Sequence, residues 1–283
     1  MKVLVTGARG QVGSATVEQF STDGKNDVVA LQHSDLDISS RNDVLVAATQ
    51  IQPDVIVNAA AMTNVDACES EIDQAFAINA LGVRNLADAA KVCGSHLIHI
   101  STDFVFDGKS QHPYTEFDIA NPLSVYATSK LGGDTEALAY ELGSVVRVAW
   151  VFGNPNGDFF SWVANGVKEG NINSLIDDQT STPTYSRDVA EVIEHIAKHR
   201  MTGLINVANA GETTRLEMGR ELCKKLGIEK DIDGIPADSL GRPAPRPSYS
   251  SLSTSVLQKT TGIEMRSWQS ALDDYISRMN MDV

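Results

Sequence analysis

Apolar runs of strand length alternate with amphipathic stretches through the first 150 residues of the chain. The runs are short and mainly apolar, as in strands of a parallel sheet covered by helices on both faces. We expect strands at 2–6, 27–31, 55–58, 96–101 and 144–149, and helices at 13–20, 41–50, 71–91 and 125–142. This alternation is typical of an α/β fold of the Rossmann type, a doubly wound parallel sheet that binds ligands at the carboxyl ends of its strands.

The pattern changes after Trp150, where a turn-rich break at 153–157 leads into shorter elements. We expect there a helical stretch, a strand at 175–176, a loop with Pro183, a helix, a strand at 204–208, a helix at 216–226, a proline-rich segment at 242–247 and a closing helix at 267–279. We therefore predict a dinucleotide-binding domain over 1–150, to which 184–205 returns. A smaller α/β C-terminal lobe, over 151–183 and 206–283, would bind the substrate.

Three glycines at a spacing of three, Gly7, Gly10 and Gly13, follow the first predicted strand. Glycines at such a strand-to-helix junction permit the turn, let the backbone approach a pyrophosphate and let the helix pack on the sheet. The unpaired amides at the helix start then face the anionic oxygens. Although the spacing differs from G-x-G-x-x-G, its position directly after a strand predicts a dinucleotide site.

The choice of dinucleotide is predicted from the second strand. NAD-preferring folds place an acid there, about twenty residues beyond the glycines, against the ribose 2′-hydroxyl. This strand ends Leu31-Gln32-His33-Ser34 without an acid, and Arg9 can reach toward a 2′-phosphate. We predict NADPH as the preferred cofactor, with NADH also usable, and place Asp37 and Ile38 beside the adenine.

Tyr126 and Lys130 stand four residues apart in a predicted helix, so that one turn brings them side by side. A neighbouring positive charge favours the phenolate, which lets a tyrosine donate a proton near neutral pH. The spacing alone also fits an ordinary exposed helical pair. Thr102 follows a buried strand at the end where ligands bind, and it either donates a hydrogen bond to a substrate carbonyl or caps the strand.

Small and amide side chains follow the third strand at Asn58, Ala59, Ala60 and Ala61. They either line the cofactor groove, where small side chains let the backbone approach ribose and phosphate, or pack a helix start. Asn79 is either a buried polar group or the asparagine that supports a proton relay through Lys130. The residues alone leave both alternatives open.

Composition narrows the class of protein. With 283 residues and 42% hydrophobic content the chain can bury a large core, and its net charge of −14 disfavours nucleic acid and anionic membranes as partners. No segment approaches the roughly 20 apolar residues of a membrane span, and the N-terminus does not read as a signal peptide, so we expect a soluble cytoplasmic protein. Three dispersed cysteines and the pair His195 and His199 give no metal-ligand pattern, and we predict no metal site.

Several segments together carry a family resemblance. They are 6–13, 53–61, 101–108, 121–130, Asp178-Gln179 and Pro183-Thr184. On these segments the chain resembles the extended short-chain dehydrogenase/reductases, and among them the dTDP-4-dehydrorhamnose reductases, over nearly its whole length. The resemblance implies an oxidoreductase of dTDP-rhamnose and polysaccharide biosynthesis. It would pass hydride from NADPH to the C4 ketone of dTDP-4-dehydro-L-rhamnose and give dTDP-L-rhamnose.

The resemblance also implies roles for individual residues. Tyr126 would donate the proton, Lys130 would hold the nicotinamide ribose and lower the pKa of the phenol, and Thr102 would hydrogen-bond the substrate carbonyl. The expected cofactor contacts are Gly7, Arg9, Gly10, Gln11, Val12, Gly13, Asp37, Ile38, Asn58, Ala59, Ala60, Ala61, Asn79, Tyr126 and Lys130. The expected substrate contacts are Thr63, Val65, Thr102, Asp103, Trp150 and Arg246, whose planar fork of donors suits a diphosphate.

The chain departs from the family pattern after Arg246, where it reads Pro247-Ser248-Tyr249, and at Met62. These departures leave the identity of the sugar open. One alternative is another extended reductase or epimerase acting on a different nucleotide sugar. A second is a non-catalytic regulatory subunit similar to the methionine adenosyltransferase beta subunit, although the segment 63–66 follows the reductase pattern better. A nucleotide sugar is the expected partner, and a homodimer is one expected assembly.

Overall fold

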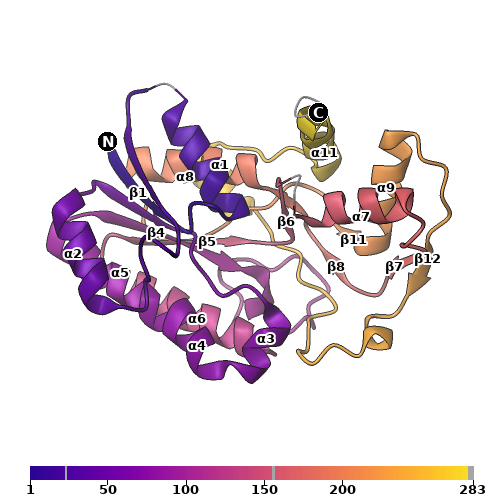
Figure 1. Ribbon diagram of the computed structural model, residues 1–283, viewed down its shortest axis with the longest axis horizontal. Coiled ribbons are helices and arrows are strands. Elements are labelled where there is room, and N and C mark those ends of the chain that lie inside the picture. The colour runs from indigo at the N-terminus through magenta and orange to yellow at the C-terminus, as the bar shows by residue number, and fades with distance from the viewer. Residues whose placement is uncertain (23, 155–156, 280–283) are drawn as a thin grey trace.

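A six-stranded parallel sheet forms the centre of the protein, with strand order β2-β1-β3-β4-β5-β10 (Figure 1). The structure, a computed structural model, describes residues 1–22, 24–154 and 157–279. The strands are β1 (Lys2–Thr6), β2 (Asp27–Leu31), β3 (Val55–Asn58), β4 (His96–Thr102), β5 (Gly143–Val148) and β10 (Gly203–Asn206). Residues of β3, β4 and β5 are buried throughout, as in parallel strands covered on both faces.

Helices cover both faces of the sheet. On one face α1 (Gln11–Ser21) and α8 (Ser186–His199) pack together over the core that contains Phe20 and Ile193. On the other face lie α2 (Arg41–Ile51), α5 (Gly82–Cys93) and α6 (Val125–Leu138), over the core that contains Leu86. The predicted doubly wound Rossmann-type fold is therefore confirmed.

The direction of winding reverses at β1, which has β2 on one side and β3 on the other. In such a sheet the loops at the carboxyl ends of the two central strands diverge and leave a crevice for a ligand. The glycine loop follows β1, and the run that begins at Ala59 follows β3. The local sequence thus places both predicted cofactor segments at one end of the sheet.

A smaller α/β lobe has its own apolar core, formed around Phe152, Phe160 and Tyr275. It contains the helices α7 (Phe159–Lys168), α9 (Arg215–Leu226) and α11 (Trp268–Met279) and the paired strands β7 (Ser174–Ile176) and β12 (Asp233–Ile235). Shorter elements are β6 (Val151–Phe152), β8 (Thr180–Ser181), β9 (Thr184–Tyr185), β11 (Thr213–Thr214) and the 3-10 helix η3 (Ala237–Leu240). Helix α10 (Ser255–Thr261) falls within the predicted substrate lobe but places Leu257 in the core on the α1 side of the sheet, and the predicted division into domains stays a prediction.

The expected helix over 71–91 is divided into α4 (Ile72–Phe76), the π-helix η1 (Ala77–Leu81) and α5. Two further short helices, α3 (Val65–Ser70) and the 3-10 helix η2 (Asp103–Val105), lie in segments for which we expected none. The helix expected to reach residue 142 ends at Leu138, and the chain then turns so tightly that a Cβ at Gly143 would lie 1.9 Å from the Ala137 carbonyl oxygen. Among the described residues no helix is long and apolar enough to cross a membrane.

Candidate active site

The glycine loop is a close-fitting backbone cradle. Gly7 has φ +65°, and a Cβ there would lie 2.5 Å from the Ala60 backbone nitrogen, while a Cβ at Gly13 would lie 2.1 Å from the Gly7 carbonyl oxygen. Helix α1 then begins after Gly10 without a side-chain cap. Its first amides are therefore open to an anion, and this uncapped helix start beside a loop without side chains fits the pyrophosphate of a dinucleotide.

A small cavity of about 300 Å³ lies beside this loop, lined among others by Arg9, Gln32 and Asp35. The Asp35 carboxylate accepts a hydrogen bond from the Gln32 amide at 3.1 Å. That bond, and to a smaller extent the charge of Arg9, lowers the pKa of the Asp35 carboxyl. Asp35 directly follows the strand end Leu31–Ser34 that was predicted to carry no acid, so an acid does stand near the predicted place of the ribose.

Asp37 and Ile38 follow this turn and face the protein. The Asp37 carboxylate accepts hydrogen bonds from the Ser39 amide and hydroxyl, at 2.9 and 2.8 Å, which lower its pKa. Ile38 is buried and packs so closely over Gly82 that a Cβ there would lie 2.8 Å from it. Their predicted place beside the adenine stays a prediction.

A larger cavity of about 490 Å³ lies at the carboxyl ends of the sheet strands. It brings together residues predicted for catalysis, for the cofactor and for the substrate: Gly10, Gln11, Val12, Ala59, Ala61, Thr63, Val65, Thr102, Asp103, Tyr126, Lys130 and Trp150. The predicted residues that do not line it are Gly7, Arg9, Gly13, Asp37, Ile38, Asn58, Ala60, Asn79 and Arg246. Phe104 and Arg215, which the sequence analysis did not consider, complete this part of the wall.

Helix α6 presents Tyr126 to this cavity. The hydroxyl of Ser124 caps the helix by accepting a hydrogen bond from the Ala127 amide at 3.2 Å, which fixes the first turn that carries the tyrosine. The Tyr126 ring meets Phe104 edge-on, with centroids 6.1 Å apart. Burial raises the pKa of the Tyr126 phenol, while a hydrogen bond with Thr102 opposes that shift.

Lys130 lies one turn beyond Tyr126 in α6, and its side chain is directed toward strand β4. Its Nζ donates to the Ile100 carbonyl oxygen at 2.7 Å and lies 3.3 Å from His99 Nε2. Burial lowers the pKa of the Lys130 amine to about 8, against an opposing effect of Asp134. In this structure the lysine amine is directed to the Ile100 carbonyl oxygen, and desolvation of the phenol is the largest cause of its raised pKa. The lowering of the phenol pKa by Lys130 stays a prediction.

Thr102 and Asp103 leave β4 together and are both buried. The Thr102 hydroxyl accepts from the Phe104 amide and donates to the Asp103 carboxylate, each at 3.2 Å. The other oxygen of Asp103 accepts from Ser181 and Ser250, which come from the C-terminal part of the chain. Burial raises the pKa of Asp103 to about 6, although these bonds oppose the rise. Asp103 therefore touches the cavity wall while its oxygens are held by neighbouring hydroxyls.

The two predicted asparagines are fully buried and hydrogen-bonded within the protein. Asn58 Oδ1 accepts from the Thr6 hydroxyl at 2.7 Å and from the Ala60 amide at 3.1 Å. Asn79, in the π-helix, accepts from the Met62 amide at 2.8 Å and donates to the Ser129 hydroxyl at 3.0 Å. These bonds favour the buried structural alternative for Asn79, which links the loop after β3 to α6.

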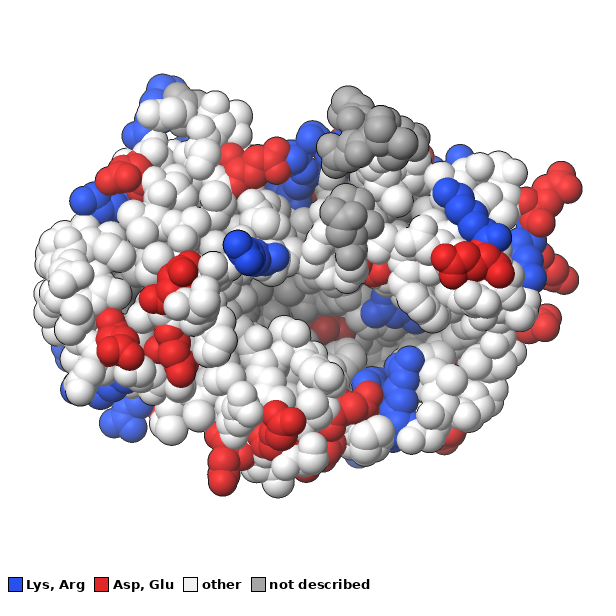
Figure 2. Space-filling view, in the orientation of Figure 1, with Lys and Arg blue, Asp and Glu red and all other residues white. Residues whose placement is uncertain are grey.

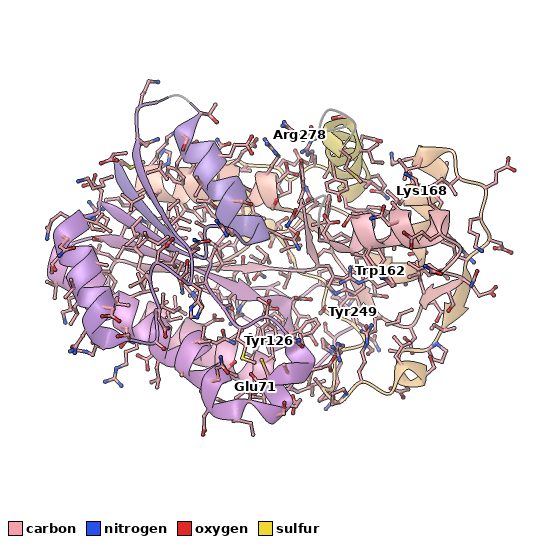
Figure 3. The ribbon with its side chains drawn as sticks, in the orientation of Figure 1. Glu71, Tyr126, Trp162, Lys168, Tyr249 and Arg278 are labelled. Carbon is pink, nitrogen blue, oxygen red and sulfur yellow. The ribbon has the colours of Figure 1, made fainter. Side chains whose placement is uncertain are left out.

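A second cavity of about 600 Å³ adjoins the first, and both are lined by Phe104, Trp150 and Arg215. Figure 2 shows the hollow across this face, with Lys and Arg side chains at its end. In Figure 3 Tyr126 lies on the sheet side of the molecule and Trp162, which lines the second cavity, lies on α7 in the C-terminal lobe. The hollow therefore has one wall from each part of the chain.

Arg215 is the cationic residue that both cavities share. Its guanidinium stacks on Trp150, 3.9 Å from the ring centroid, and on Phe159 at 4.7 Å. Burial lowers its pKa to about 10, and no carboxylate among the described residues forms an ion pair with it. Trp150 has φ 41°, a strained conformation for a bulky residue. Arg215 is the first residue of helix α9, where a positive charge is unfavourable because of the helix dipole. A cation at a predicted helix start could have indicated this site residue from the sequence.

Arg246 also lines the second cavity, but its charge is balanced. The guanidinium donates to both oxygens of Asp66, at 3.1 and 2.8 Å, and to the Ala244 carbonyl oxygen. These bonds place Arg246 at the rim, opposite the start of α3. A direct contact between Arg246 and a substrate diphosphate stays a prediction.

The fold and the site together define the class of protein. A glycine cradle beside a Tyr-x-x-x-Lys helix, at the end of a doubly wound sheet with a smaller lobe, is the arrangement of an extended short-chain dehydrogenase/reductase. The chain belongs to the RmlD family, because the family model described as RmlD substrate binding domain matches residues 1–281. The resemblance proposed from the sequence is thereby confirmed.

Individual relatives agree with this assignment. The dTDP-4-dehydrorhamnose reductase of Mycobacterium tuberculosis is 37% identical over 281 residues, which cover 96% of this chain and 91% of that protein. The solved structure of a dTDP-4-dehydrorhamnose reductase from Clostridium acetobutylicum has a TM-score of 0.95 at 34% identity and covers 99% of this chain and 100% of that one. A dTDP-4-dehydrorhamnose reductase from Bacillus anthracis, solved in complex with NADP, has a TM-score of 0.94 at 29% identity, with 98% and 99% covered.

Proposed function

We propose that this protein catalyses the NADPH-dependent reduction of the C4 ketone of a nucleotide-linked 4-keto-6-deoxy sugar, namely dTDP-4-dehydro-L-rhamnose to dTDP-L-rhamnose. The observation that carries the proposal is the single cavity whose walls hold Tyr126, Thr102 and the start of the helix that follows the glycine cradle. A ketone there meets two hydroxyl groups beside the place for a nicotinamide. The reductases among the relatives support the same chemistry.

The cofactor, when bound, supplies the hydride that converts the ketone into an alkoxide. The Tyr126 hydroxyl donates a proton to that oxygen. The Thr102 hydroxyl, once it turns from the Asp103 carboxylate to which it donates in this structure, donates a hydrogen bond to the same oxygen, so that negative charge is stabilised where it develops. Lys130 holds the nicotinamide ribose through its amine. Gly7, Gly10 and Gly13, with the amides of Gln11 and Val12, cradle the pyrophosphate.

The second cavity binds the nucleotide diphosphate portion of the substrate. Removing a cation from water is costly, and a diphosphate would compensate a half-buried guanidinium that forms no ion pair with a carboxylate among the described residues. Arg215 is that cation, with Arg242 and Arg246 further along the same wall. Thr63, Val65 and Trp150 line the first cavity and are the proposed contacts to the sugar.

Two alternatives differ from this proposal in what they do with the cofactor. An epimerase of the same class would interconvert nucleotide sugars without net consumption of NADPH. A regulatory subunit would bind the dinucleotide without turnover. Three further expectations stay predictions for the reductase, the epimerase and the regulatory subunit alike. They are the division into a sheet domain and a substrate lobe, the homodimer and the cytoplasmic location.

The proposal is tested by incubating the protein with NADPH and a small panel of 4-keto sugar nucleotides. We expect oxidation of NADPH in proportion to the reduced sugar formed, with dTDP-4-dehydro-L-rhamnose as the best substrate of the panel. A nucleotide sugar that changes configuration while NADPH stays constant would favour the epimerase. Binding of NADPH without oxidation by any member of the panel would favour the regulatory subunit.

A further inference from the structure

Two serines from the C-terminal part of the chain reach the wall of the catalytic cavity. Ser181 lies in β8, and Ser250 lies in the segment that the bridge between Thr180 and Tyr249 joins to that strand. Both serines are buried, and their hydroxyl oxygens lie 3.0 Å apart. Neither takes part in the proposed chemistry, although both bond Asp103, a residue of the cavity wall.

Asp103 provides the one carboxylate that lines the catalytic cavity among the described residues. Its oxygen Oδ2 accepts from the hydroxyls of both serines, and its oxygen Oδ1 accepts from the Thr102 hydroxyl at 3.2 Å. The χ2 torsion of an aspartate has no sharp preference, so hydrogen bonds decide how the carboxylate is turned. By holding Oδ2, Ser181 and Ser250 therefore fix the direction of Oδ1.

The serines also determine how much free energy is needed to take Thr102 away from Asp103. An ionised carboxylate has acceptors only, and each hydroxyl has one proton to donate. If Thr102 were the only donor, its departure would leave a buried charge without a hydrogen bond, which is costly. With two serine hydroxyls on Oδ2 the carboxylate keeps charge-assisted hydrogen bonds when Thr102 leaves.

We propose that Ser181 and Ser250 are positioning residues that hold the Asp103 carboxylate, so that the Thr102 hydroxyl can turn from it to the substrate ketone. The inference rests on the proposed function, in which Thr102 donates a hydrogen bond to that ketone. The serines are 78 and 147 residues away from Asp103 along the chain. The C-terminal part of the chain therefore contributes to the catalytic step as well as to substrate binding.

Two titratable groups from other elements lie within electrostatic range of Asp103. The charge of Asp103 acts to raise the pKa of the Arg215 guanidinium in α9 and of the Tyr126 phenol in α6. The Arg215 guanidinium is stacked on Trp150, and the Tyr126 phenol bonds Thr102. Within the part of the chain that the structure describes, the side-chain donors to the Asp103 carboxylate are therefore the three hydroxyls.

The first test needs no turnover and follows the Asp103 carboxyl by carbon NMR in protein labelled at the aspartate carboxyl carbon, with the resonance assigned by its absence from Asp103→Asn. We expect Ser250→Ala to raise the titration midpoint by about one pH unit, because a hydrogen bond to the ionised form is lost. Ser181→Ala should act in the same direction and replaces Ser250→Ala if that variant does not fold. Ser251→Ala is the matched control, since Ser251 is also buried and is not a donor to Asp103. An unchanged midpoint in the test variants, or an equal rise in the control, would overturn the inference.

The second test is a double-mutant cycle of Ser250→Ala with Thr102→Val, with dTDP-4-dehydro-L-rhamnose as substrate. We expect Ser250→Ala to lower kcat about tenfold, and to have little further effect once Thr102→Val has removed the hydroxyl, while the dissociation constant of NADPH stays the same. Equal losses of kcat in both backgrounds would overturn the inference, because a serine that only supports the fold acts independently of Thr102. A wild type that reduces none of the 4-keto sugar nucleotides would count against the proposed function instead, and the carboxyl titration would still decide whether the serines hold Asp103.

Discussion

The Arg246 guanidinium holds both carboxylate oxygens of Asp66, at 3.1 and 2.8 Å, and so ties the proline-rich segment to α3 at the rim of the second cavity. This bond is also the main reason that the pKa of Asp66 is lowered. We predict that Arg246→Ala raises the Michaelis constant for the sugar nucleotide about tenfold, consistent with a charged hydrogen bond of about 1.5–3 kcal/mol. The affinity for NADPH should stay the same.

Arg246 could bind the substrate or only support the proline-rich segment, and Asp66→Asn distinguishes these two roles. This variant weakens the ion pair with Arg246 but keeps the guanidinium available to the substrate. If Arg246 only supports the segment, both variants lower the melting temperature by similar amounts and neither changes the Michaelis constant. That outcome would remove Arg246 from the substrate site.

Arg215 provides a second prediction, since it is the half-buried cation that both cavities share. Arg215→Ala should weaken binding of the sugar nucleotide by at least tenfold, because a charge-assisted hydrogen bond and a cation–π platform are lost together. Calorimetric titration with dTDP measures the effect directly. Lys224→Ala is the control, since that lysine lies on the same helix and is exposed. Equal affinities for dTDP in the wild type and Arg215→Ala would place the diphosphate elsewhere.

Two charges of opposite sign line the small cavity beside the glycine loop, Arg9 after β1 and Asp35 after β2, and we expect them to decide cofactor choice. We predict that Arg9→Ala weakens NADPH binding selectively, because the guanidinium would pair with the 2′-phosphate, while NADH binding changes little. Asp35→Asn should do the reverse and strengthen NADPH binding, since it removes a negative charge from the same cavity. Dissociation constants of both dinucleotides for the three proteins decide the matter. A wild type that prefers NADH would show that Asp35 outweighs Arg9.

Asp103 predicts a specific pH dependence of stability. Its pKa is raised to about 6 in the folded protein from 3.8, so the folded state binds more protons than the unfolded state between these values. Its contribution therefore becomes less favourable as pH rises from about 4 to 6, by on the order of 3 kcal/mol, and is constant above that range. Between pH 4 and 6 the unfolding free energy of Asp103→Asn should therefore increase relative to that of the wild type.

Asp107→Asn is the contrast to this variant, because the pKa of Asp107 is lowered by its hydrogen bonds with Asn121 and Lys109. Its neutral substitute should lose stability relative to the wild type as pH rises through the acid range. Parallel curves for wild type and Asp103→Asn between pH 4 and 6 would show that the Asp103 carboxyl is not perturbed.

The sequence predicted what depends on local order along the chain. The strand at residues 27–31 and the turn of helix that carries Tyr126 and Lys130 follow from periodicity and spacing, which act over a few residues. The partners of Asp103 could not be predicted in this way, because Ser181 and Ser250 are 78 and 147 residues away along the chain. The position of the Lys130 amine could not be predicted either. Spacing placed Lys130 one turn from Tyr126, but the carbonyl oxygen of Ile100 in strand β4 determines where the amine lies.

The most direct test of the account compares steady-state NADPH oxidation by the wild type and by Tyr126→Phe with dTDP-4-dehydro-L-rhamnose as substrate. Removal of the hydroxyl should lower turnover about 10²- to 10⁴-fold and leave NADPH affinity largely intact, since only the proton donor is lost. Tyr140→Phe is the control, because that phenol is buried and donates to the Ala90 and Ser95 carbonyl oxygens outside the site. A Tyr126→Phe variant that keeps more than about a third of wild-type turnover would contradict the central claim that this site reduces the ketone with Tyr126 as its acid.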